Sequence, residues 1–231
     1  MQRPRDMVSP SPSPHRSREL DREIEVIDAR FEAMAARCRR QIALGLGAFW
    51  TGSKEAVAEV ERQDTAVDEA EKSIDELLLR ALALRQPVAS DLRKLTASFK
   101  IVTDLERIGD EAVNIARGTA PTCAEAESIR TCLSRMGELA EPMVGSAVTS
   151  FLDKDRSLAQ RVLDHNGMVD GLHDSVLRDS IDLVSRHPAD VPSAMASIEV
   201  ARCLKRIAEH AKNIAEGTLF VVGNDDEPMP L

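Results

Sequence analysis

The sequence predicts an all-α protein made of two tandem antiparallel three-helix bundles related by internal duplication. The first observation is a repeat, because residues 105–118 return as residues 204–217 with 8 of 14 positions identical at a constant offset of 99. A weaker register aligns residues 49–60 with residues 151–162 at an offset of 102. Each half therefore carries the same elements in the same order.

The composition is the second observation. Aromatic residues make up only 3% of the chain, Tyr is absent, and the 43% hydrophobic content consists mainly of Ala, Leu, Val and Ile. Such residues suit closely packed helices better than a sandwich or barrel, so we expect no sheet. The net charge of −9 excludes a general binder of nucleic-acid backbones, which needs a basic face.

The third observation is a set of six long amphipathic segments separated by turn signals. Residues 1–18 are rich in Ser and Pro and are predicted to form a disordered arm, because they cannot bury enough apolar surface to order themselves. The first bundle spans residues 19–119, the second spans residues 120–223, and an acidic tail follows at 224–231. The breaks after the six helices fall, in order, at residues 51–53, 86–87, 118–121, 153–155, 187–188 and 223. Long helices joined by such short loops must run antiparallel.

The sequence also indicates a cytoplasmic location. The four cysteines show no Cys-x-x-Cys spacing, and the first twenty residues lack the apolar core of a signal peptide. The longest apolar run, residues 42–50, falls short of the roughly 18 residues needed to span a bilayer. We therefore expect contact with a membrane only through partners.

Acidic stripes on two helices of the first half are the candidate site. Glu106, Asp110 and Asn114 line the side of their helix opposite its apolar sector, and Asp64 and Asp68 repeat the i,i+4 spacing on the preceding helix. Neighbouring helices of one bundle would bring the four carboxylates to one surface patch. Oxygen ligands of this kind suit magnesium, manganese and iron, and zinc less typically.

A solvated charged face is the alternative interpretation of these stripes. It is supported by possible i,i+4 partners, namely Lys100 for Asp104 and Arg107 for Glu111. Both interpretations stay open on spacing alone.

Other residues that often carry chemistry fit structural roles better. His173 and His210 are predicted to be structural or surface residues, and Cys203 a small buried apolar residue. The sequence contains no nucleophile elbow, P-loop or Gly-x-Gly-x-x-Gly motif. We therefore expect a protein that is not an enzyme.

Several segments resemble the PhoU family of phosphate-transport accessory and regulatory proteins. Residues 86–93, 100–110 and 114–116 resemble the first half of that family, and residues 204–216 resemble the second. The resemblance implies a cytoplasmic, often homodimeric protein made of two three-helix bundles. It also implies two partners, the ATPase subunit of a phosphate ABC transporter and a sensor histidine kinase.

The family carries Glu/Asp-x-x-x-Asp motifs that hold iron or zinc clusters in some members. The first-half pairs Glu106 with Asp110 and Asp64 with Asp68 match this pattern. The second half departs from it, because Lys205 stands where a carboxylate is expected. Asn166 likewise replaces the acid that would pair with Asp170. The candidate ligands that remain are Asp170 and Glu209. A charged lysine cannot ligate a metal, so we expect a plain Lys205–Glu209 salt bridge in place of a full second cluster.

The leading functional hypothesis is a regulatory adaptor of inorganic phosphate uptake that represses the phosphate-starvation response. The alternative is a metal-binding helical bundle with a metal-dependent redox or hydrolytic activity. A third hypothesis is a structural scaffold without a ligand.

Overall fold

The computed structural model describes residues 14–85, 87, 89–118 and 126–223, which form six long α-helices and one short 3₁₀ helix. No strand occurs among these residues, so the predicted all-α class is confirmed. The elements are α1 (Pro14–Thr51), α2 (Lys54–Arg85), α3 (Ala89–Arg117), α4 (Glu127–Leu152), α5 (Arg156–Arg186), η1 (Pro188–Asp190) and α6 (Val191–Gly223).

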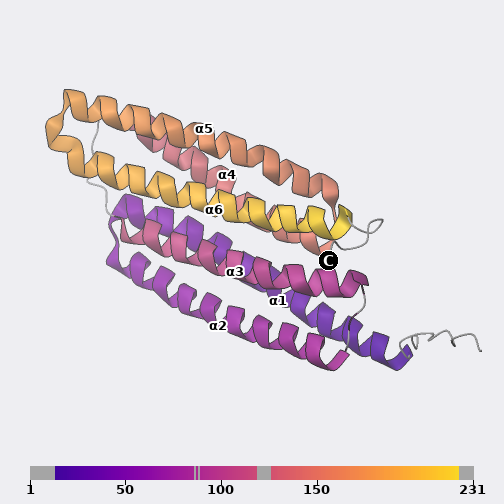
Figure 1. Ribbon diagram of the computed structural model, residues 1–231. Coiled ribbons are helices and arrows are strands. Elements are labelled where there is room, and N and C mark those ends of the chain that lie inside the picture. Colours follow the sequence, from indigo (N-terminus) through magenta and orange to yellow (C-terminus); the bar gives the residue numbers. More distant parts are fainter. Residues whose placement is uncertain (1–13, 86, 88, 119–125, 224–231) are drawn as a thin grey trace, which may run out of the picture.

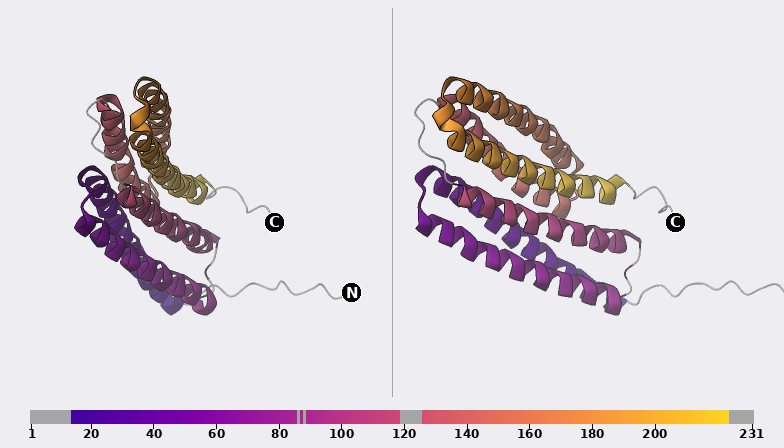
Figure 2. Two further views of the ribbon diagram at one scale, coloured as in Figure 1. Left: turned by 90° about the vertical axis from the view of Figure 1, so that its left-hand side faces the viewer. Right: turned by 60° about the vertical axis from the view of Figure 1, so that its left-hand side comes forward.

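The helices form two three-helix bundles that lie side by side (Figure 1). Helices α1, α2 and α3 pack against one another, and so do α4, α5 and α6. The bundles meet where α3 packs against α6 and α1 against α4, whereas α2 and α5 contact only their own bundle. Figure 2 shows the same arrangement from two other sides, with α2 and α5 outermost.

The first turn of each bundle repeats in backbone detail, as duplication predicts. Gly52, between α1 and α2, has φ +65°, and its equivalent Lys154, between α4 and α5, has φ +54°. The next residue caps the following helix in both cases, because Ser53 Oγ accepts from the Ala56 amide and Asp155 Oδ1 from the Leu158 amide. The two halves therefore share a chain reversal in which one residue adopts the left-handed conformation.

One continuous core runs through both bundles. Ile108 of α3 and its repeat equivalent Ile207 of α6 are both fully buried in it. Another equivalent pair, Arg39 of α1 and Glu141 of α4, forms an ion pair with 2.6 Å between Nε and Oε1. Contact between repeat-equivalent residues indicates that a pseudo-twofold axis passes between the bundles.

The first helix starts earlier than the sequence predicts. Helix α1 begins at Pro14, inside the segment 1–18 that its composition marks as a disordered arm, so this part of the prediction is wrong for residues 14–18. Proline suits the first turn of a helix, since its fixed φ is already helical and its missing N–H has no partner there. Residues 1–13, the division between bundles at 119/120 and the tail 224–231 lie outside the described residues.

In the described part of the chain, none of the helices combines the length and the apolar character that crossing a bilayer requires.

The packing of α1 on α3 generates a test of the core. A Cβ added to Gly45 would lie 2.7 Å from the backbone oxygen of Ala112, whereas one added to Gly47 would meet nothing within 4 Å. We expect Gly45→Ala to lower the free energy of unfolding by about 1–3 kcal/mol, because the two backbones must separate. The matched control Gly47→Ala should raise it by about 0.5–1 kcal/mol through helix propensity. Urea unfolding of both variants measures the difference, and equal effects would contradict this packing.

Candidate cation site between α2 and α3

Four carboxylates lie along the contact between α2 and α3, and we call them the acidic ridge. They are Asp64 and Asp68 on α2 and Glu106 and Asp110 on α3. Each interacts electrostatically with others across the contact, because Asp64 is affected by the charge of Asp110 and Glu106 by that of Asp68. The structure thus gathers along one helix contact the acids that the sequence singled out on two separate helices.

Two members of the ridge are poorly solvated. Burial raises the pKa of Asp64, and the neighbouring charges of Asp68 and Asp110 add to the shift. Burial likewise raises the pKa of Glu106, followed by repulsion from Asp110 one turn along α3. Both shifts disfavour the ionised form of these two carboxylates.

A buried amide of α1 supports the ridge from below. Gln41 is fully buried, and its Nε2 donates to Asp64 Oδ1 at 3.3 Å. Its Oε1 is buried and accepts no hydrogen bond within the described part of the chain. Gly109 of α3 leaves room for this arrangement, since a Cβ there would lie 3.0 Å from Asp64 Oδ1 and 3.4 Å from Gln41 Oε1. Helices α1 and α3 therefore fix the position of a carboxylate that α2 supplies.

Two further acids extend the ridge and were missed by the sequence analysis. Glu71 and Asp75 continue the stripe of Asp64 and Asp68 along α2. Burial raises the pKa of Glu71, with repulsion from Asp75 and Asp68 as further causes, and burial raises the pKa of Asp75. The spacing 64, 68, 71, 75 is the regular signal of one helix face and could have revealed them.

Arginines supply the positive charge beside the ridge. Arg107 contacts Glu106 at 3.4 Å and Asp110 at 3.3 Å, but its own side chain is 57% exposed. Arg117 pairs with Glu61 at 2.8 Å near the end of the groove. Exposed pairs of this kind are weak, so they compensate the ridge only in part.

Several expected contacts within α3 are wrong. Asp104 pairs with His210 rather than Lys100, and Glu111 pairs with Arg206 rather than Arg107. The packing of α6 against α3 explains both changes, because it brings the His210 ring to Asp104 and the Arg206 guanidinium to Glu111.

Asn114, the fifth predicted first-half ligand, lies apart from the ridge contacts. It is exposed, and its Nδ2 donates to Glu111 Oε2 at 3.5 Å. Because Glu111 pairs with Arg206 of α6, this contact places the Asn114 amide on the side of α3 that faces α6.

In the second half, a lysine lies between the equivalent acids. Lys205 Nζ is 3.1 Å from Asp170 Oδ1 and 3.9 Å from Glu209 Oε1, which confirms the expected Lys205–Glu209 pair and adds a closer one. Contact with Asp170 raises the pKa of Lys205, so the ammonium is charged at neutral pH. Asn166 completes the group by donating from Nδ2 to Asp170 Oδ2 at 3.3 Å.

The acidic ridge is an open row rather than a closed cage. In the described part of the chain, no three His, Cys, Asp or Glu side chains are gathered closely enough to hold a metal ion. Metal binding at the ridge and at Asp170 and Glu209 therefore stays a prediction.

The remaining residues of interest have structural environments. Cys203 is 7% exposed, as predicted, and burial together with the Glu111 carboxylate raises its pKa to about 12, which leaves a protonated thiol. His210 Nδ1 lies 2.8 Å from Asp104 Oδ1 across the junction of the bundles. His173 is mostly buried and lies 3.5 Å from Asp174.

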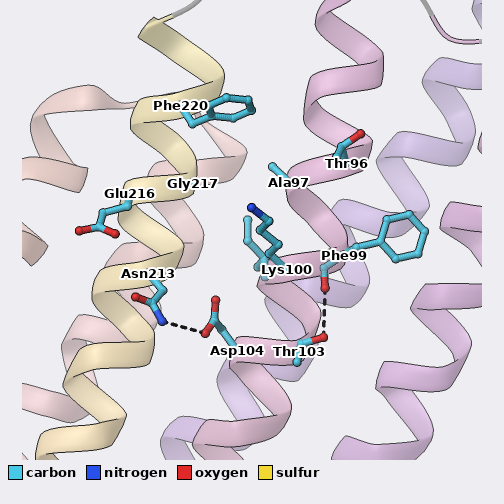
Figure 3. Close-up of a pocket in the computed structure, with 11 residues that line it drawn as sticks. Thr96, Ala97, Phe99, Lys100, Thr103, Asp104, Asn213, Glu216, Gly217 and Phe220 are labelled. Atoms are coloured by element: carbon cyan, nitrogen blue, oxygen red, sulfur yellow. Dashed lines mark hydrogen bonds between the residues drawn. The ribbon is translucent and has the colours of Figure 1, made fainter. Parts of the chain in front are cut away.

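A cleft of about 700 Å³ opens between α3 and α6, away from the ridge. Figure 3 shows Phe220 pointing from α6 towards α3, with Lys100 between the helices and Asn213 bonded to Asp104. The lining combines the aromatic side chains of Phe99 and Phe220 with the carboxylates of Asp104 and Glu216, and none of the four ridge acids lines it.

The fold and the ridge together define a class, namely proteins built from two copies of a three-helix bundle that carries an acidic motif at its second and third helices. Comparison with known proteins identifies the class further. Residues 31–119 and 133–218 match the model of the PhoU domain family. The chain therefore belongs to the PhoU family, as its motifs suggested.

Individual relatives agree along most of the chain. Proteins named phosphate-specific transport system accessory protein PhoU homolog are 32% identical in Pseudomonas putida, over 92% of this chain and 84% of the relative, and 33% identical in Pseudomonas aeruginosa, over 92% and 88%. The crystal structure of PhoU from Pseudomonas aeruginosa has a TM-score of 0.81 at 32% identity and covers 88% of this chain and 98% of that one. A Streptococcus pneumoniae structure, at 23% identity and TM-score 0.80 over 92% and 100%, shares the fold.

The raised pKa of Glu106 generates a prediction on pH. Because the folded state holds its proton more tightly than the unfolded state, the free energy of unfolding falls as pH rises from the ordinary pKa of 4.5 through the raised one. In chelator at pH 7, Glu106→Gln should therefore raise the free energy of unfolding by about 0.5 kcal/mol, with the gain vanishing near pH 4. Exposed Glu32 of α1 provides the matched control Glu32→Gln, and a gain independent of pH would contradict the explanation.

Proposed function

We propose that the protein is a cytoplasmic regulator of inorganic phosphate uptake that links a phosphate ABC transporter to a sensor histidine kinase. The observation that carries the proposal is the match of both halves, over 92% of the chain, to relatives named as accessory proteins of the phosphate-specific transport system. These names also support a role outside catalysis.

The protein would act by binding its partners directly. The adaptor binds the transporter's ATPase subunit and the kinase, and it favours restrained transport and a silent kinase when phosphate is plentiful. It can shift the conformational equilibrium of each partner only by its differential affinity for the two conformations, commonly about 1–3 kcal/mol. The two similar halves support this role, because α2 and α5 present equivalent outer faces that do not pack against the other bundle.

The acidic ridge would add a cation to this adaptor. Its metal ligands would be carboxylate oxygens, which suit magnesium, manganese or iron, and zinc less typically. The fit rests on the partly buried carboxylates of Asp64 and Glu106, whose repulsion by Asp68 and Asp110 is only partly relieved, and on the Gln41 amide that fixes Asp64. A bound cation supplies the missing positive charge. Partly exposed Asp68 and Asp110 can turn towards it by changing rotamer.

The homodimer that the resemblance implies stays a prediction. Sedimentation of the purified chain would show whether it forms in solution.

The regulatory role predicts a phenotype. In a strain that lacks the gene and grows in excess phosphate, alkaline phosphatase expression and phosphate accumulation should both rise, because transport and kinase are no longer restrained. Expression of the full chain should restore both to the parental level. Unchanged reporter activity and unchanged phosphate content in the deletion strain would reject the role.

The cation site predicts a loss of binding on removal of two ridge charges. Calorimetric titration of the whole chain with manganese should show binding that weakens more than tenfold in Asp64→Asn/Glu106→Gln, since two of the four anionic ligands are removed. Glu32→Gln serves as the charge-matched control and should bind as the parent does. Equal binding by all three proteins would place any cation elsewhere. Redox or hydrolytic turnover that the double variant abolishes would instead favour the metal-dependent enzyme.

A further inference from the structure

The two halves differ in concert at the positions that surround the acidic ridge. Asp64 corresponds to Asn166 by the offset of 102, and Glu106 corresponds to Lys205 by the offset of 99. The first change removes one negative charge and the second replaces a negative charge with a positive one. Because both act in the same direction on the same groove, they indicate a single electrostatic difference between the halves.

The supporting residues differ as well. Buried Gln41 of α1, which donates to Asp64, corresponds to Met143 of α4, which is also buried. Gly109, which leaves room beside the Asp64 carboxylate, corresponds to Ala208. The second half thus lacks the amide that holds the α2 carboxylate and the space that the carboxylate uses. These differences are at positions inside the fold, so random substitution of exposed charged residues does not explain them.

The Lys205 ammonium occupies the place that the second-half acids leave between them. It lies 3.1 Å from Asp170 on α5 and 3.9 Å from Glu209 on its own helix. Asp174, on the next turn of α5, is the other acid that acts on it. In the first half, Glu106 and Asp110 are instead contacted by Arg107, whose side chain is mostly exposed, and Arg117 acts on Asp64.

We propose that Lys205 replaces the bound cation in the second half, so that each chain has one cation site, at the first-half ridge, and a Lys205→Glu substitution opens a second. The ligands of that second site would be carboxylates at positions 170, 205 and 209 and the carbonyl oxygen of Asn166. That carbonyl oxygen is already buried and accepts no hydrogen bond among the described residues. The proposal rests on the cation site proposed above.

The test isolates the second half. In the background Asp64→Asn/Glu106→Gln, which silences the first site, the full chain is titrated with manganese with and without Lys205→Glu. Without it, we expect no binding. With it, we expect one manganese per chain and a thermal midpoint that rises by about 5–10 °C when manganese exceeds its Kd a hundredfold.

The matched control is Lys212→Glu in the same background. Lys212 lies on α6 and pairs with Glu216 at 3.4 Å, so this substitution makes the same change of net charge and breaks an equivalent pair. It should leave the chain unable to bind manganese. Binding by the control would mean that added negative charge alone attracts the ion, which would overturn the proposal.

The reverse exchange is a second readout that does not depend on opening a site. Glu106→Lys in the parent should abolish manganese binding and, in chelator, raise the thermal midpoint above that of the parent, because a permanent ammonium then lies among the ridge carboxylates. A lower midpoint in a folded variant would overturn the proposal.

The outcomes separate the two proposals. If the parent binds one manganese through the ridge and Lys205→Glu adds none, the role of Lys205 fails while the first-half site stands. If the parent binds none but Lys205→Glu binds one, the first-half site fails and with it the assignment of one cation site to each chain, and only the blocking of the second half by Lys205 stands. If the parent's manganese is lost on Asp170→Asn rather than on Glu106→Gln, the assignment of the site to the first half is wrong.

Discussion

Helix α3 packs against α1, α2 and α6, so most of its circumference is covered and one strip, which includes Lys100, Arg107 and Asn114, reaches solvent. Glu106 and Asp110 lie beside that strip on the side of α2, whereas Asp104 and Glu111 lie on the side of α6. This explains why Glu106 is partly buried although it belongs to a surface stripe. The packing of α2 against α3 within the first bundle therefore creates the desolvation that raises the pKa of Glu106.

The two halves resolve the same repulsion in different ways. In the second half, Lys205 is a covalently attached cation that no change in ion concentration removes. In the first half, the exposed guanidinium of Arg107 compensates less, and the ridge keeps an unmet demand for positive charge. A cation bound there would be sensitive to its concentration, to pH and to any partner that covers α2 or α3. Asymmetry between the halves is thus what would allow a regulator to respond to its surroundings without a change of fold.

The sequence predicted the fold class because the repeat and the helical periodicity are local signals, and it predicted the acids of the ridge because i,i+4 spacing is local too. It did not predict Gln41, since a single amide on the apolar side of α1 shows its partner only after α1 and α2 pack. It also assigned Asp104 and Glu111 to partners on their own helix, whereas α6 supplies both. What escaped prediction was decided by which helix faces met, a tertiary property that periodicity does not contain.

Duplication explains how one site could be lost while the fold was retained. Most of the identical positions of the repeat, such as Ile108 with Ile207 and Ala112 with Ala211, are buried, and any change there would disturb packing. The stripe residues contribute little to the core, so Glu106 and Lys205 could diverge without changing how α3 and α6 pack. The second half pairs Lys205 with Asp170, and it carries Met143 and Ala208 where the first half has Gln41 and Gly109. Both side chains suit an apolar interior, so the two halves differ in their charge pattern while they share one fold.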